Sequence, residues 1–170
     1  MKKFLLAVFT IGFTTSMIIA PATQVAAISE DQAGLISMTC GSIQLQLKNL
    51  QKADSRWRVS LGARYEFVLG SLITNLNLRL IKNNLATDDL ASLQTTFSSE
   101  RDFFKFAFTD YSKSLDELIA TDCKSNPYDF YDKLETTRDK REAVRASYLR
   151  LNDVLEWHRT AVVELKAGLL

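Results

Sequence analysis

The sequence has few of the residues that build most catalytic and metal sites. Its 170 residues include one histidine and two cysteines. Metal centres need clustered His, Cys, Asp and Glu side chains, and neither Cys-x-x-Cys nor Glu-x-x-His occurs. A Ser–His or Cys–His nucleophile therefore has little support. We expect a non-enzymatic protein with no catalytic residues, no metal and no cofactor. Carboxylate-based hydrolysis stays open, because the chain has 20 acidic residues.

Breakers of helical structure are also scarce. From Ile28 onward the chain contains one proline, Pro127, and five of the six glycines. So few breakers make helix the default structure over a stretch of this length. The sequence therefore predicts an all-α fold.

The chain carries almost no net charge. Leaving out Lys2 and Lys3 reduces the 21 basic residues to 19, against 20 acidic ones. A balanced domain has no global field to attract a polyanion, so we expect no nucleic-acid partner. Cations do flank Trp57 between Lys52 and Arg58, as in an anionic-glycan or nucleic-acid patch. We favour a buried Trp57 with solvated arginines, because Trp57 falls on the apolar stripe of its helix.

The first residues have the pattern of a secretory signal peptide, assigned to residues 1–27. Lys2 and Lys3 precede an apolar run, Phe4–Ile19, and Val25–Ala27 offers small residues for cleavage. The sequence predicts a secreted or extracytoplasmic protein of the cell envelope. The alternative is an uncleaved segment that anchors the chain, which would be its only membrane contact.

A heptad pattern dominates the last part of the chain. Apolar and polar seam positions recur in steps of four and three, which predicts one helix over residues 127–166. The seam consists of Phe130, Leu134, Thr137, Arg141, Val144, Tyr148, Leu151, Leu155, His158, Val162 and Leu165. A helix of roughly 40 residues spans about 60 Å and cannot bury such a seam against itself. It needs partner helices.

Two further helices are predicted, over residues 42–84 and 88–121. Thr87 is a candidate N-cap for the second of these, and Asn126 precedes Pro127 as N-cap of the last helix. Upstream, Ser29 and Gln32 form a capping-box pattern, but Gly34 and Gly41 lie close behind. We expect only a short or frayed helix over residues 29–39.

Short connections should make the three helices antiparallel, as an elongated, coiled-coil-like three-helix bundle over residues 28–170. Cys40 and Cys123 then share one end, where an oxidising compartment favours a disulfide. Their distances from the intervening turn differ by roughly 13 Å along the axis. We expect a break near residues 70–77, or a non-helical chain around Cys40 and Gly41, to absorb the difference.

Polar seam residues predict specific contacts. With the cysteines level, Asp54 lies close to Arg141, which predicts a buried ion pair that fixes the register. The equally weighted alternative is that both side chains reach outward into solvent. His158 is expected to be partly buried and hydrogen-bonded rather than a ligand or catalyst.

The aromatic run around residue 105 is a candidate contact surface. Phe104 and Phe108 belong to the apolar stripe, whereas Phe103 and Phe106 point away from it. A pair of outward phenylalanines indicates a protein partner or self-association. The alternatives are isolated surface aromatics or a wider core.

Several runs carry a resemblance to known proteins. These are Leu61–Glu66, Leu76–Leu85, Asp122-Cys123 and Phe130-Tyr131. They resemble runs in uncharacterised secreted helical proteins of the Saccharibacteria, a group of ultrasmall, host-attached bacteria. The resemblance implies export and a helical fold, and no activity. From the residues themselves we expect an exported structural or interaction protein. The alternative is a small helical binding module or chaperone for an apolar ligand or unfolded chain.

Overall fold

The computed structural model describes residues 28–85 and 87–169. The predicted signal peptide, residues 1–27, lies outside these residues. The described chain forms α1 (Glu30–Phe67), η1 (Val68–Ile73), α2 (Thr74–Lys82), α3 (Asp88–Ala120) and α4 (Pro127–Gly168). Within these ranges there is no strand. The prediction of an all-α fold is confirmed.

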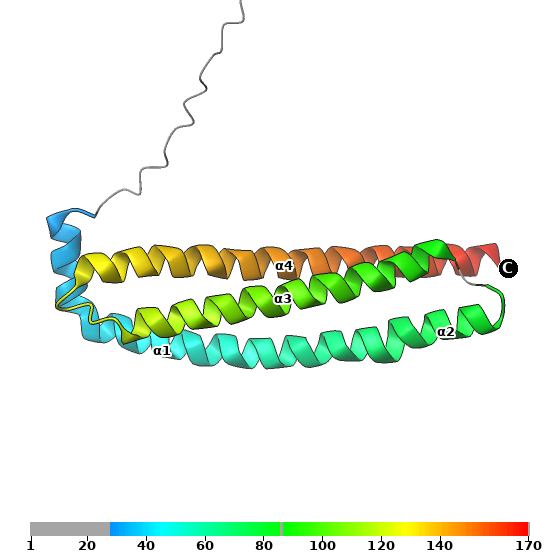
Figure 1. The fold of residues 1–170 in the computed structure, drawn as a ribbon, viewed down its shortest axis with the longest axis horizontal. Coiled ribbons are helices and arrows are strands. Elements are labelled where there is room, and N and C mark those ends of the chain that lie inside the picture. The colour runs from blue at the N-terminus through cyan, green and yellow to red at the C-terminus, as the bar shows by residue number, and fades with distance from the viewer. Residues whose placement is uncertain (1–27, 86, 170) are drawn as a thin grey trace, which may run out of the picture.

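The helices form three long rods (Figure 1). In the first rod, α1, η1 and α2 follow one another without a turn; α3 and α4 are the other two. The chain reverses after α2 and again after α3, and the rods lie side by side along the longest axis. Packing is closest between α3 and α4, and α1 lies farther from both. The first turns of α1 bend away from the rest of the rod (Figure 1).

The first helix starts well before residue 42, so the predicted start was wrong. Ser29 Oγ accepts a hydrogen bond from the Gln32 backbone N–H at 3.3 Å, and Gln32 Oε1 accepts from the Ser29 N–H at 3.1 Å. This complete capping box begins the helix at Glu30. Gly34 and Gly41 cost the helix about 1 kcal/mol each relative to alanine. The cap and the tertiary contacts that follow outweigh that cost.

The interruption of the first rod is a π-helix, η1, and the chain around Cys40 and Gly41 is helical. A π-helical turn holds one more residue than an α-helical turn, so it rotates the face that follows it. The buried positions from the end of η1 onward are accordingly Ile73, Asn77 and Leu80. Leu72 lies on the apolar stripe of the helix predicted over residues 42–84 and would point inward in an unbroken α-helix. In the structure it is 52% exposed.

Asn77 is a polar residue that η1 turns into the interior. Its Nδ2 donates to the Leu90 carbonyl at 3.1 Å and to Gln94 Oε1 at 2.7 Å. A buried amide needs such partners, because an unpaired polar group in the interior is destabilising. Asn77 therefore fixes α2 against the start of α3.

Aromatic rings form the centre of the core. Tyr65 of α1 packs edge-on against Phe97 and Phe104 of α3, with ring centroids 5.9 and 5.7 Å apart. Phe104 and Phe108 continue the row to Tyr111. Burial raises the pKa of Tyr65 to about 12. The row extends over the middle of the molecule, where the candidate site lies.

Candidate binding site between α1 and α4

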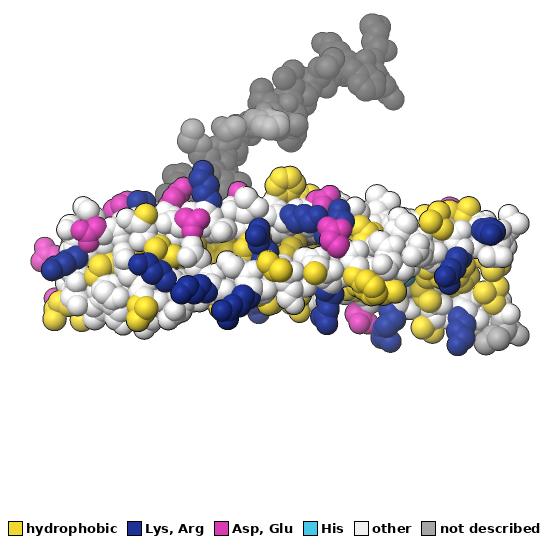
Figure 2. Space-filling model, turned by 90° about the horizontal axis from the view of Figure 1, so that it is seen from below, with side chains coloured by type: hydrophobic (Ala, Val, Ile, Leu, Met, Phe, Trp, Pro, Cys, Tyr) yellow, Lys and Arg dark blue, Asp and Glu magenta, His cyan; other side chains and the backbone are white. Residues whose placement is uncertain are grey.

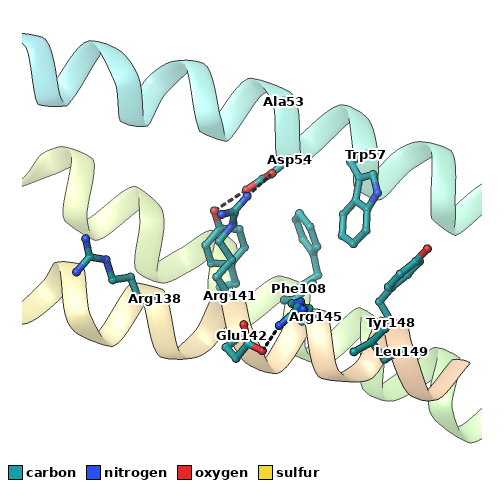
Figure 3. A pocket seen from close by; sticks show the side chains of 12 residues that line it. Ala53, Asp54, Trp57, Phe108, Arg138, Arg141, Glu142, Arg145, Tyr148 and Leu149 are labelled. Carbon is teal, nitrogen blue, oxygen red and sulfur yellow. Dashed lines mark hydrogen bonds and ion pairs between the residues drawn. The ribbon is translucent and has the colours of Figure 1, made fainter. Parts of the chain in front are cut away.

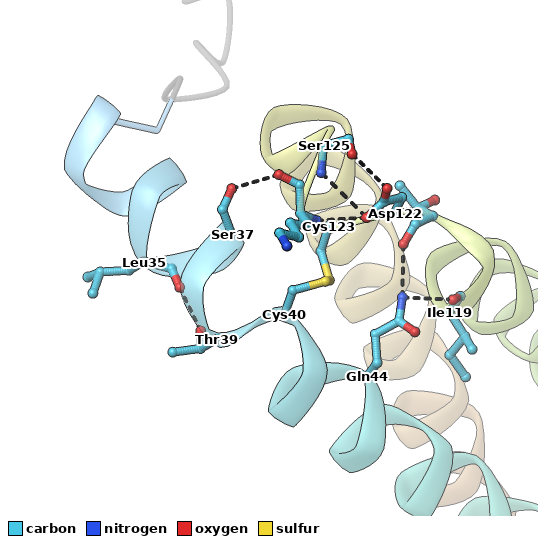
Figure 4. Close-up of a disulfide and its surroundings, with 11 residues drawn as sticks. Leu35, Ser37, Thr39, Cys40, Gln44, Ile119, Asp122, Cys123 and Ser125 are labelled. Carbon is cyan, nitrogen blue, oxygen red and sulfur yellow. Dashed lines mark hydrogen bonds between the residues drawn. A yellow bond between two sulfur atoms is a disulfide. The ribbon is translucent and has the colours of Figure 1, made fainter.

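A disulfide fixes one end of the rods (Figure 4). The Cα atoms of Cys40 and Cys123 are 5.5 Å apart, and the two residues are bonded. Beside them, Gln44 Nε2 donates to the carbonyls of Ile119 and Thr121 at 3.2 and 3.0 Å. Ser37 Oγ donates to the Lys124 carbonyl at 3.0 Å. These bonds hold α1 to the connection between α3 and α4, as the pairing of the two cysteines predicted.

Asp54 and Arg141 lie together farther along the rods (Figure 3). Arg141 Nε is 3.3 Å from Asp54 Oδ2, and the Tyr111 hydroxyl donates to the same oxygen at 2.6 Å. The Asp54 side chain is 16% exposed and that of Arg141 is 54% exposed. The pair is therefore not buried, because the long arginine side chain keeps its guanidinium at the surface. The predicted ion pair did not include Tyr111, which is the buried partner of Asp54.

The structure predicts unequal effects for the two ends of this ion pair. Asp54→Ala leaves the buried Tyr111 hydroxyl without an acceptor, which should lower the free energy of unfolding by about 1 to 3 kcal/mol. Arg141→Ala removes an exposed partner and should cost less than about 1 kcal/mol. Urea unfolding of both variants measures the difference. In a Tyr111→Phe background the Asp54 effect should shrink, and equal costs for the two variants would contradict this account.

A pocket of about 730 Å³ opens beside this ion pair, between α1 and α4 and over α3. In Figure 3, Asp54 and Trp57 of α1 face Arg141, Arg145 and Tyr148 of α4. The pocket exists because α1 lies farther from α4 than α3 does. It is lined by Ala53, Asp54, Trp57, Phe108, Tyr111, Arg138, Arg141, Glu142, Val144, Arg145, Tyr148 and Leu149.

Trp57 was expected to be buried, and that expectation was wrong. The side chain is 38% exposed and forms part of the pocket wall. Its ring lies 5.9 Å from Phe104 and 5.5 Å from Tyr148, measured between centroids. The apolar stripe correctly turns Trp57 toward the other helices. Tyr148 of α4 covers one part of the ring, and another part faces the pocket.

The pocket has a basic surrounding. On α4, Arg138 is bound to Glu135 at 2.5 Å and Arg145 to Glu142 at 3.0 Å. All four of these side chains are at least 39% exposed, so these local pairs are weak and can exchange partners at little cost. On α1, residues 48–64 contain one acidic residue, Asp54, and five basic ones: Lys48, Lys52, Arg56, Arg58 and Arg64. None of these five basic residues lines the pocket. Figure 2, seen from below, shows dark blue side chains on the side of α1 that is turned away from α3 and α4.

The predicted contact residues lie on α3, apart from the pocket. Phe103 is 56% exposed and Phe106 is 72% exposed. Neither residue lines the pocket. The described chain thus has two separate candidate surfaces, one aromatic pair on α3 and one concave site. The sequence prediction found the pair but missed Tyr148, Arg145 and Leu149 as pocket residues. The recurrence of basic residues over 138–150 was the available signal, since Arg138, Arg141 and Arg145 line the pocket.

His158 is half-buried, and Nε2 has no hydrogen-bond partner among the described residues. Burial lowers the pKa of His158 below its usual 6.5, because a charged imidazolium loses hydration there. The unfolded chain then binds the proton more tightly. The stability that the neutral ring provides is present above pH 6.5 and should be lost as the pH falls through the folded-state pKa.

Titration of the only histidine by NMR measures this pKa directly. The expected value lies below 6.5, and the free energy of unfolding should fall between pH 6.5 and more acidic conditions. The control variant His158→Gln should lose that part of the pH dependence. A folded-state pKa at or above 6.5 would contradict the prediction.

Other kinds of site find no support in the described ranges. There, no group of three or more His, Cys, Asp and Glu side chains is placed to hold a metal ion. None of the helices over residues 28–85 and 87–169 is both long and apolar enough to cross a membrane. Comparison with known proteins found no matching family model, curated protein or solved structure. The site must therefore be interpreted from its own chemistry.

Proposed function

We propose that this protein is an exported, disulfide-linked antiparallel three-helix bundle that binds another protein through the outer face of α3. The supporting observation is the exposed pair Phe103 and Phe106, which lie almost one helical turn apart. Full burial of an exposed phenylalanine side chain contributes about 1.5 to 3 kcal/mol of hydrophobic free energy, so covering this pair would favour binding. Interfaces are enriched in such anchors. The proposal assigns no catalytic residue.

Export is the second part of this proposal. Residues 1–27 carry the signal-peptide pattern, and the Cys40–Cys123 disulfide is compatible with an oxidising compartment outside the cytoplasm. The bundle would then work at the cell envelope or beyond it. Fractionation of the native cells with an antibody against residues 28–170 tests this part.

Cross-linking pull-down of the full chain from its native cells tests the partner. Wild-type protein should recover a partner that Phe106→Asp does not, because a carboxylate at the contact centre would have to be desolvated. Thr160→Asp is the matched control, since it adds the same charge at an exposed position on α4. Equal recovery by wild type and Phe106→Asp would refute the proposal for this face.

The α1–α4 pocket favours a second candidate, a small binding module for an apolar ligand or an unfolded chain. Its volume lies within the range of small-molecule sites, and its walls are mainly aromatic and aliphatic. A hydrophobic dye should bind the native protein and be displaced by a lipid or a peptide. Leu149→Asp should abolish dye binding, because Leu149 lines the pocket and is 48% exposed.

A further inference from the structure

We propose that the α1–α4 pocket receives the α3 face of a second copy of this chain, with Phe106 as the inserted anchor. This inference rests on the proposed function, because it names the protein that the Phe103–Phe106 face binds. It also gives the pocket an occupant. The two surfaces belong to one interface, each copy providing one half.

The donor surface, the outer face of α3 around Phe106, combines an aromatic anchor with two carboxylates. Phe106 is the most exposed phenylalanine of the described chain. Asp102 and Asp110 lie four residues before and after it, on the same side of α3. Asp110 is exposed, and the Asp102 side chain is 50% exposed in an ion pair with Arg101 at 3.0 Å, with Lys105 Nζ 3.9 Å away. The two carboxylates are eight residues apart, a separation of about 12 Å along the helix axis.

The acceptor surface has the complementary arrangement. Trp57, Phe108 and Tyr148 provide aromatic walls for a phenyl ring. Arg138 and Arg145 line the same pocket, seven residues apart on α4 and therefore about 10.5 Å apart along its axis. This spacing is close to that of the two aspartates. Each arginine now contacts a glutamate of its own helix, in an exposed pair that can be given up.

Charge complementarity favours a second copy over an unrelated partner. The basic residues that line the pocket are Arg138, Arg141 and Arg145 of α4; Arg141 is paired with Asp54, and the other two hold exposed pairs on their own helix. Opposite charges at the rim steer association and fix register. Acidic residues flanking an exposed phenylalanine are the matching chemistry, and this chain itself supplies them on α3.

The geometry makes the interface heterologous. The Phe106 face lies on α3 and the pocket opens between α1 and α4. A copy whose Phe106 is bound by a neighbour therefore still has an empty pocket. Such head-to-tail contacts build rings or open chains rather than closed two-fold dimers. The mass of the assembly should therefore rise with concentration beyond that of a dimer.

Sedimentation velocity on residues 28–170 tests the inference, with circular dichroism confirming that each variant is folded. Wild type should increase in average mass more than two-fold between about 1 µM and 1 mM. Phe106→Asp lacks the donor, and Arg145→Glu reverses the charge at the pocket; each alone should remain monomeric. Mixed in equal amounts they should form a dimer and nothing larger, because only one functional donor–pocket pair is then available.

Three results would overturn the inference. These are a wild type that does not associate, a Phe106→Asp variant that associates as wild type does, and a mixture that stays monomeric. Monomeric wild type together with a partner recovered by pull-down, and lost in Phe106→Asp, would refute self-association and retain the proposed function. A monomer that recovers no partner would refute both.

Discussion

Breaking the Cys40–Cys123 disulfide should lower the free energy of unfolding by about 4 to 5 kcal/mol in the chain-entropy model. The cysteines are separated by 83 residues, so the bond closes a long loop and removes much conformational freedom from the unfolded chain. A single domain is typically stable by only about 5 to 15 kcal/mol. The reduced protein should therefore be close to unfolding at physiological temperature.

The measurement is urea unfolding of wild type and of the double variant Cys40→Ala/Cys123→Ala, each with and without a thiol reductant. Reductant should weaken wild type to the level of the double variant and leave the double variant unchanged. An effect on wild type below about 1 kcal/mol would show that the unfolded state is already compact without the bond. The single variants are poorer probes, because each leaves one free thiol.

Phe104→Ala should cost about 3 to 5 kcal/mol of stability, the range for a phenylalanine removed from a packed core. Phe104 is 2% exposed and its ring contacts those of Trp57, Tyr65 and Phe108. Its neighbour Phe103 is 56% exposed. Phe103→Ala should therefore change stability by less than about 0.5 kcal/mol.

This pair of variants is a matched comparison, because the same substitution is made at adjacent positions of one helix. Helix propensity changes equally in both, so the difference reports burial alone. Thermal or urea unfolding at a concentration where the chain is monomeric gives the two values. Similar losses at both positions would mean that the outer face of α3 is covered in solution.

The helices were predictable where periodic apolar positions coincide with strong end signals. Asn126 and Pro127 mark the start of α4, and Thr87 accepts from the Leu90 N–H at 3.4 Å at the start of α3. The start of α1 was missed because glycine propensity was weighed above the capping box of Ser29. A break near residues 70–77 was one of the two expectations, but its form, a π turn that changes the inward face, was not, because the apolar pattern assumes 3.6 residues per turn throughout.

Some contacts between the helices could also be predicted from the sequence, and others could not. The approach of Asp54 to Arg141 follows from helix register once the cysteines are level, so sequence was sufficient for it. The exposure of Trp57 depends on how far α1 lies from α4. A stripe of apolar residues predicts which way the side chain points, but not the distance between the two helices. Pocket residues such as Tyr148 and Leu149 depend on that distance too, which is why they were not predicted.

The disulfide links α1 to the connection between α3 and α4 at one end of the three rods. This covalent link lies at the end where α4 begins, while α2 and the last turns of α4 lie at the opposite end (Figure 1). At that end the chain connects α2 to α3, and the bonds of Asn77 reinforce this connection. Among the described residues, the last turns of α4 are held there by side-chain packing. Thermal opening should therefore start with the last turns of α4 and proceed toward the disulfide, which would expose the aromatic row while α1 stays bonded to the α3–α4 connection.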